Sequence, residues 1–206
     1  MGAAWKEQVI QELIAEGNDE QVVRMIDALW DLEPEQINER LDLQMRLGRR
    51  YLVLALSQTG GTSDEDLEVL LEREFEQGIP AQSGTEGNRI VLEWYAEAEK
   101  LFVAVLERAS LLRTKAEAFA HRGFLHFLRG ASDLALADLD QACSFLPLSP
   151  DLSYWRGMIL ASLGALEAAQ VALKFASEHD QDNERYRRAY VRVMGNGGGY
   201  KRAVLM

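Results

Sequence analysis

Two consecutive segments within residues 116–182 repeat each other at a fixed offset of 34 positions, and this feature constrains the fold more than any other. Seven residues are identical at that offset, and all but one of them are small or apolar. The identical pairs are Arg122 and Arg156, Gly123 and Gly157, Gly130 and Gly164, Ala131 and Ala165, Ala135 and Ala169, Leu139 and Leu173, and Ala142 and Ala176. A period near 34 residues is typical of stacked helical hairpins. The repeat therefore predicts a helical repeat fold.

The composition of the whole chain also favours helices. Only four of the 206 residues are prolines, and long runs are rich in Ala, Leu, Glu, Gln and Arg, which are good helix formers. Hydrophobic residues make up 48% of the chain, enough for a sizeable core. We expect an all-α fold of about ten helices, a right-handed stack of antiparallel hairpins with a capping helix at the C-terminus.

The spacing of apolar residues predicts four helices in an N-terminal region, residues 1–77. The first covers residues 3–16, and the second is capped by Asn18. The third begins near Pro34, and the fourth follows Ser63. The fourth helix turns four leucine and phenylalanine side chains inward, namely Leu67, Leu70, Leu71 and Phe75. Its other face carries Glu68, Glu72, Glu74 and Glu76, which we expect to face solvent.

Residues 78–88 are rich in Gly, Ser, Thr and Pro and predict a loop that separates the N-terminal region from the rest. A long helix over residues 89–112 follows, and Thr114 with Glu117 forms a predicted capping box that opens the first repeat. The later boundaries are the two repeats at 116–149 and 150–183, a closing helix within 183–194, and a Gly-rich tail at 195–206. Glycines at 130 and 164 are the expected turns between the paired helices.

The repeat region resembles the tetratricopeptide repeat family. Small residues occupy the family's small positions at Gly123, Gly157, Ala135, Ala169, Ala142 and Ala176, and Phe119, Leu139, Leu173 and Pro147 match its aromatic, large apolar and closing proline positions. The sequence departs from the pattern at Ser153 and Gln181, and at His126 and Leu160, where tyrosine is usual. Small residues let the two helices of a hairpin approach closely. The resemblance covers about a third of the chain and implies a protein that binds partners.

Members of this family bind peptides on a concave face made by the first helix of each hairpin. The resemblance assigns to that face Glu117, Ala120, Phe124, Phe127 and Leu128, then Asp151, Tyr154, Met158 and Ala161. The positively charged and asparagine residues that clamp a C-terminal carboxylate in some members are missing, so the predicted groove is apolar and aromatic. We expect Phe124 and Tyr154 to anchor a ligand. An alternative remains open, in which Phe124 and Phe127 pack under the long helix or the N-terminal region.

Arginines cluster near the C-terminus of an otherwise acidic chain. The net charge is −11, whereas residues 183–206 alone carry +5. On the closing helix, Arg185, Arg188 and Arg192 share one face, which predicts a basic end of the groove that binds acidic groups. The acidic remainder argues against nucleic acid as the main partner, because phosphate binding needs clustered Lys and Arg.

The sequence shows no catalytic motif, and we expect no enzymatic activity, no cofactor and no metal. His121 and His126 are five residues apart and point to different sides of a helix. Cys143 is the only cysteine, so no intrachain disulfide is possible, which suits a reducing cytoplasm. No apolar run reaches the ~20 residues that a membrane-spanning helix needs.

These features predict a non-catalytic protein-protein interaction module, an adaptor, scaffold or chaperone-like protein. Its partner would be another protein or peptide of acidic and apolar character, held in the groove as an extended segment or a helix. The alternative is a structural protein that self-associates through the same groove or through the C-terminal peptide Ala203–Met206.

Overall fold

The structure is a computed structural model, and it describes residues 19–32, 36–58, 66–77 and 86–195. Within these ranges the chain forms nine helices and no strands, so the predicted all-α class is confirmed. The helices are α2 (Glu20–Asp31), α3 (Ile37–Ser57), α4 (Leu67–Gln77), α5 (Glu86–Arg108), α6 (Leu112–Leu128), α7 (Ser132–Phe145), α8 (Pro150–Ser162), α9 (Leu166–His179) and α10 (Glu184–Gly195). The helix predicted over residues 3–16 and the tail after residue 195 lie outside the described residues.

Several predicted helix boundaries are wrong by a few residues. The side chain of Asp19, not that of Asn18, caps α2, because its Oδ1 accepts a hydrogen bond from the Val22 amide at 3.0 Å. The loop predicted over 78–88 ends earlier, since α5 begins at Glu86. Thr114 opens no helix, because α6 already begins at Leu112, and the N-cap residue Leu111 makes no capping hydrogen bond with its side chain. Helix α8 begins as predicted, with Ser149 capping the amide of Leu152.

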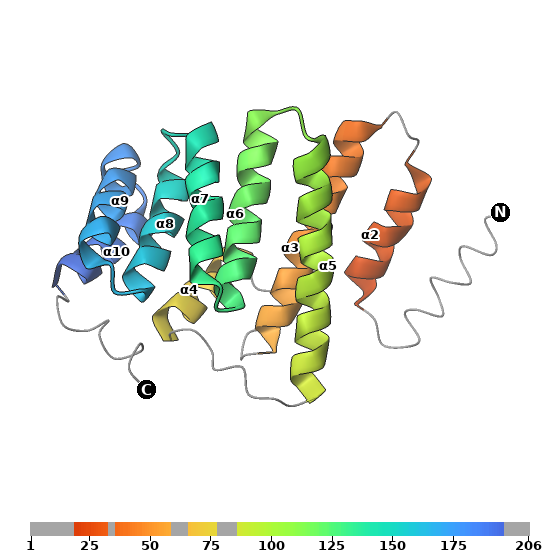
Figure 1. The fold of residues 1–206 in the computed structure, drawn as a ribbon, viewed down its shortest axis with the longest axis horizontal. Helices are drawn as coiled ribbons and strands as arrows, with labels where there is room; N and C mark the ends of the chain where they lie inside the picture. The colour runs from red at the N-terminus through yellow and green to blue at the C-terminus, as the bar shows by residue number, and fades with distance from the viewer. Residues whose placement is uncertain (1–18, 33–35, 59–65, 78–85, 196–206) are drawn as a thin grey trace.

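The two predicted hairpins are α6 with α7 and α8 with α9, and the helices within each pair pack closely (Figure 1). Both pairs turn at a glycine with positive φ, Gly130 at 75° and Gly164 at 77°, a conformation that other residues rarely adopt. Their small residues lie where the helices touch. A Cβ atom on Gly157 would be 2.6 Å from Leu173 Cγ, and one on Gly123 would be 3.1 Å from the Ala135 carbonyl oxygen.

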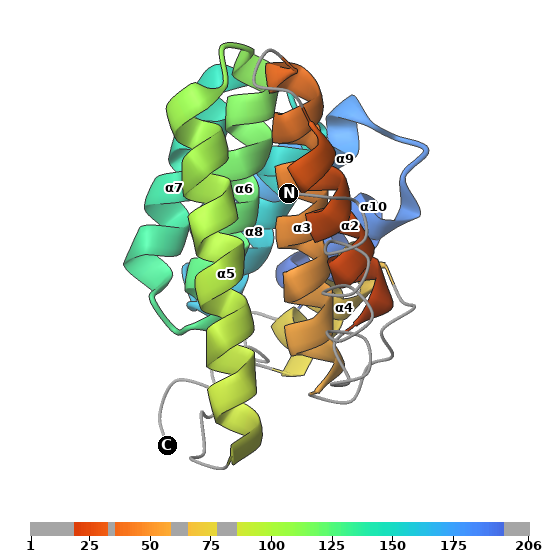
Figure 2. The ribbon, with the colours of Figure 1, turned by 90° about the vertical axis from the view of Figure 1, so that its right-hand side faces the viewer.

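Helices α3 and α5 pack side by side along most of their length, and α5 continues the row onto α6 (Figures 1 and 2). Their contact is close at Gly48, where an added Cβ would be 2.6 Å from the ring of Phe102. Helix α2 packs on α3 and is joined to it by an ion pair of 2.6 Å between Asp19 and Arg50. These contacts attach the N-terminal helices to the repeat region.

A single cluster of buried residues runs from Leu41 in α3 to Val193 in α10. The segment at 78–88 therefore does not divide the chain into two cores, although it does separate α4 from α5 in the sequence. Helix α4 is part of this cluster and lies across the molecule from α7 (Figure 2). None of the described helices has the length and apolar character needed to cross a membrane.

Candidate functional site

Seven of the nine predicted groove residues lie in the core of the protein. Ala120, Phe124, Phe127, Leu128, Tyr154, Met158 and Ala161 are each no more than 4% exposed. The prediction of an open groove lined by these side chains is therefore wrong, and their predicted contact with a peptide stays a prediction. The other two, Glu117 and Asp151, are exposed. Glu117 pairs with Arg113 and lines a hollow of about 140 Å³ beside α3.

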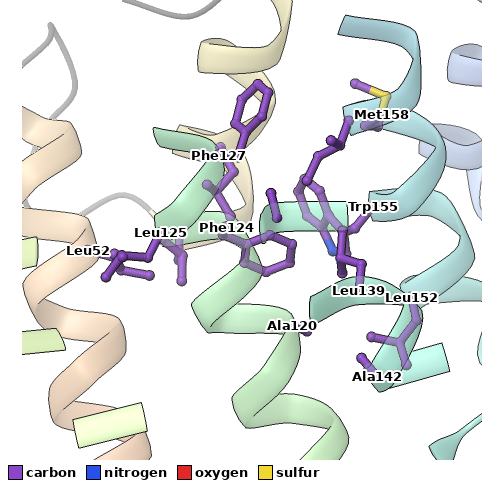
Figure 3. Packing of buried hydrophobic residues seen from close by; sticks show 14 of the residues in the cluster. Leu52, Ala120, Phe124, Leu125, Phe127, Leu139, Ala142, Leu152, Trp155 and Met158 are labelled. Atoms are coloured by element: carbon purple, nitrogen blue, oxygen red, sulfur yellow. The ribbon is translucent and has the colours of Figure 1, made fainter. Parts of the chain in front are cut away.

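Helix α4 covers the aromatic residues that α6 and α8 present. The ring of Phe75 stacks on Phe127 with 4.4 Å between centroids, and it lies 5.8 Å from Trp155. Figure 3 shows Phe124 pointing from α6 towards Trp155 of α8, and Phe127 pointing away towards the neighbouring α4. The open alternative holds for Phe127, which packs under α4 of the N-terminal region. Phe124 instead contacts His121 of its own helix and Trp155 of α8. Burial of the Phe75 side chain contributes about 2–3 kcal/mol to holding α4 in place.

A carboxylate of α4 is bound by two residues from distant parts of the chain. The Tyr154 hydroxyl donates to Glu72 Oε1 at 2.5 Å, and Arg185 Nε donates to the same oxygen at 2.7 Å. The Arg185 guanidinium also lies over the rings of Tyr154 and Trp155, at 5.5 and 5.8 Å from their centroids. We call Phe127, Tyr154, Trp155 and Arg185 the α4-binding surface.

The α4-binding surface is fixed from behind by further contacts. The Tyr154 ring lies 4.9 Å from that of Tyr186, whose hydroxyl donates to Asp151. Burial, together with the hydrogen bond to Glu72, raises the pKa of Tyr154 well above its usual range, and Arg185 only partly opposes this. Tyr154 therefore stays a neutral hydrogen-bond donor at every physiological pH, and Arg185 supplies the positive charge.

The three arginines predicted to form one basic face are divided by the structure. Arg185 turns towards α4, whereas Arg188 pairs with Glu184 at 3.2 Å on its own helix. Arg188 and Arg192 line a shallow hollow together with Arg187 and Val191. Arg185 does bind an acidic group, as the sequence predicted for this face, but the acid belongs to the same chain.

Of the acidic residues of α4 predicted to be solvated, one is buried and two form ion pairs with arginines of other helices while staying partly exposed. Glu74 is 3% exposed, Glu68 pairs with Arg49 at 2.9 Å, and Glu72 is bound by Arg185. Sequence reasoning missed Glu72, Phe75 and Trp155 as site residues. A signal did exist in the spacing of Glu72 and Phe75, because residues three apart share one side of a helix and can meet a single surface.

The candidate catalytic residues occupy structural positions. The His121 ring is buried, with Nδ1 2.7 Å from the Glu117 carbonyl oxygen, and burial with nearby Arg49 lowers its pKa to about 4. His126 lies 3.5 Å from Asp138. Burial raises the pKa of the Cys143 thiol, which disfavours the reactive thiolate. Within the described ranges, no group of three or more His, Cys, Asp or Glu residues is placed to hold a metal ion.

In comparisons with known proteins, no family model matches the chain, and neither curated proteins nor solved structures give a match. The contacts of the described residues are therefore the basis for a functional proposal.

Proposed function

We propose that this protein is a non-catalytic protein-protein interaction module, of the adaptor, scaffold or chaperone-like kind, that binds partner segments on the side of α6, α8 and α10 where α4 lies. One observation carries the proposal. The chain itself presents a helix, α4, to aromatic rings and an arginine from three other helices. An amphipathic helix lying in a groove of this composition is a common mode of peptide recognition.

The proposal includes the arrangement of the helices. We propose that the hairpins α6–α7 and α8–α9 stack with α10 as a right-handed solenoid of the tetratricopeptide repeat kind. Supporting this, an added Cβ on Gly123 would lie 3.1 Å from the Ala135 carbonyl oxygen, and one on Gly157 would lie 3.3 Å from that of Ala169, at matching positions of the 34-residue repeat. An experimental structure measures the rotation between successive hairpins. A left-handed or flat arrangement would contradict this part of the proposal.

The chemistry of the described residues supports binding rather than catalysis. His121 is buried against the rings of Phe102 and Phe124, with Nδ1 close to a carbonyl oxygen, and Cys143 is half-buried. Aromatic residues and arginine, which contribute most to binding energy at protein interfaces, are instead concentrated beside α4.

Site-specific photo-crosslinking tests the proposal. A photoreactive amino acid is introduced at exposed Val69 of α4 or at exposed Arg188 of α10, the helix that also carries Arg185. The control position is exposed Leu134 of α7, the helix that lies across the molecule from α4. We expect the same partner protein to be captured from cells at Val69 and Arg188 and not at Leu134. Equal capture at all three positions would contradict the proposal.

Self-association through this side is the alternative function, and the same experiment separates it from partner binding. Crosslinks at Val69 and Arg188 that join only copies of this chain would favour the structural, self-assembling protein. The mass of the purified chain in solution checks that result directly.

A further inference from the structure

We infer that α4 is a resident ligand of the α4-binding surface, and that the partner is an acidic amphipathic helix that competes with α4 for it. The recognised pattern is a carboxylate followed three residues later by an aromatic ring, with leucines before them, as in Leu70, Leu71, Glu72 and Phe75. This inference rests on the proposed function, because it names the partner class and the regulation of the same surface.

Helix α4 is bound in the way a separate peptide would be. At 11 residues it is the shortest of the described helices, and an isolated helix of that length is marginal in water. Glu68 pairs with Arg49 of the preceding α3. The contacts of Glu72, in contrast, reach across 82 residues to Tyr154 and 113 residues to Arg185, and they form only when α4 docks. Docking and helix formation of α4 therefore belong to one equilibrium.

The contacts of α4 also indicate which side chains the α4-binding surface can bind. The Glu72 carboxylate receives one charged and one neutral hydrogen bond at the same oxygen, and a carboxamide could accept them only without the ionic attraction. Phe75 enters between Phe127 and Trp155, a position that suits a flat ring. Leu70 and Leu71 are 1% and 0% exposed, so both side chains are buried in the core cluster when α4 is docked. A basic or purely polar helix would leave Arg185 and these rings without partners.

Residence on the same chain gives α4 an advantage over any external helix. An intramolecular ligand acts at a high effective concentration, on the order of millimolar for a short linker. An external helix binds only to the fraction of molecules in which α4 is undocked, and its apparent affinity falls by that fraction. Weakening α4 must then strengthen binding of an external helix, whereas a fixed core helix would show no such effect.

The test uses the full-length chain and a fluorescent synthetic peptide with the sequence of residues 66–77. The peptide is titrated into the wild type and into a variant with loosened α4, Glu72→Gln with Phe75→Ala. Anisotropy measures binding, and circular dichroism verifies the fold. We expect the loosened variant to bind the peptide at least about tenfold more tightly than the wild type. If the double variant loses its helical signal, Glu72→Gln alone replaces it, with a smaller expected gain in the same direction.

Two matched variants locate the binding. In the loosened background, Arg185→Gln should weaken peptide binding about tenfold, since it removes a charge-assisted hydrogen bond. Arg188→Gln, on the same helix but paired only with Glu184 among the contacts described above, should leave binding unchanged. A peptide carrying the change Glu72→Gln should lose the same factor as the Arg185→Gln protein. Equal effects of the two arginine changes would contradict recognition of the carboxylate by Arg185.

Equal or absent peptide binding in the wild type and the folded loosened variant would overturn the inference and show α4 to be a fixed part of the core. A wild-type dimer that Glu72→Gln with Phe75→Ala abolishes would also overturn it, because a second copy would then be the occupant. Neither result decides the proposed function. A partner captured beside Val69 and Arg188 while α4 stays docked would keep the interaction module and refute only displacement. If the loosened variant binds the peptide more tightly but no partner is captured, displacement of α4 is supported and the interaction module is contradicted.

Discussion

At the scale of single residues, the fold depends on positions where two helices leave no room for a side chain. Gly157 is such a position, because an added Cβ would lie 2.6 Å from Leu173 Cγ and 2.9 Å from Leu173 Cδ2. Leu173 is itself fully buried and cannot move away freely. The small residues that form the sequence repeat are therefore determined by packing between paired helices.

We expect Gly157→Ala to destabilise the protein by about 1–2 kcal/mol, because overpacking outweighs the gain in helix propensity. Chemical denaturation monitored by circular dichroism measures the change. Gly195→Ala is the matched control, since Gly195 ends α10 with no atom within 4 Å of an added Cβ. If Gly157→Ala were as stable as the wild type, the close contact with Leu173 would be wrong.

Another residue-scale prediction concerns the pH dependence of stability through His121. Burial, with Arg49 nearby, lowers the pKa of His121 to about 4 in the folded state, against 6.5 when unfolded. Between these values the unfolded chain binds more protons, so the free energy of unfolding must fall as the pH falls from 6.5 towards 4. At about pH 5 the loss from this group is on the order of 2 kcal/mol.

Replacing His121 tests that assignment. Denaturation at about pH 7 and about pH 5 should show a smaller loss of stability in His121→Phe than in the wild type. His179→Asn is the control, because His179 also has Nδ1 near a carbonyl oxygen four residues back, that of Phe175, but is exposed. The assignment is refuted if His121→Phe loses as much stability as the wild type at the lower pH.

At the scale of helices, two arginines at the same position of the sequence repeat form ion pairs that differ in burial. Arg122 binds Asp138 of α7 with two hydrogen bonds of 2.7 Å, and Asp138 is buried. Its counterpart 34 residues on, Arg156, makes one bond of 2.6 Å to Asp140, whose side chain is 54% exposed. The first pair is enclosed between α6 and α7, and the second is screened by solvent.

We expect Arg122→Gln to destabilise the protein by on the order of 3 kcal/mol, because it leaves a buried carboxylate without its main partner. Arg156→Gln should cost less than about 1 kcal/mol. Thermal unfolding of the two variants at neutral pH measures both. Similar losses in the two variants would show that burial does not distinguish these ion pairs.

The presence of the helices could be predicted from the sequence, whereas the residues of the α4-binding surface could not. The apolar spacing of α4 identified Leu67, Leu70, Leu71 and Phe75 as its buried residues, and the structure confirms this. Glu72 was wrongly predicted to face solvent, because the pattern of acids and leucines in α4 does not indicate which other helix contacts each face. Its partners lie in α8 and α10, and only the tertiary arrangement brings them there.

The same limitation explains the predicted groove. The positions 124, 127, 154 and 158 were chosen by resemblance, and they do lie on the side of α6 and α8 that other helices cover. Nothing in the repeat itself indicates that a helix from outside the repeat occupies that side. Local patterns determine which residues are apolar, whereas the occupant of an apolar face is determined by contacts between distant segments.

At the scale of the whole molecule, Phe102 of α5 connects the N-terminal helices to the repeat region. It is fully buried, its ring meets the backbone of α3 at Gly48, and it lies 5.7 Å from the His121 ring of α6. Since one buried cluster includes both regions, they should unfold together.

We expect Phe102→Ala to destabilise the described helices as one unit, by roughly 3–5 kcal/mol, because it creates a cavity where α3, α5 and α6 meet. Hydrogen exchange measured by mass spectrometry should then show equal losses of protection in peptides from α3 and α8, although α8 is remote from the cavity. Ile90→Ala on the same helix is the control, since Ile90 is 41% exposed and should change exchange little. Loss of protection confined to α3 and α5, with α8 unaffected, would mean that the N-terminal helices unfold independently of the repeats.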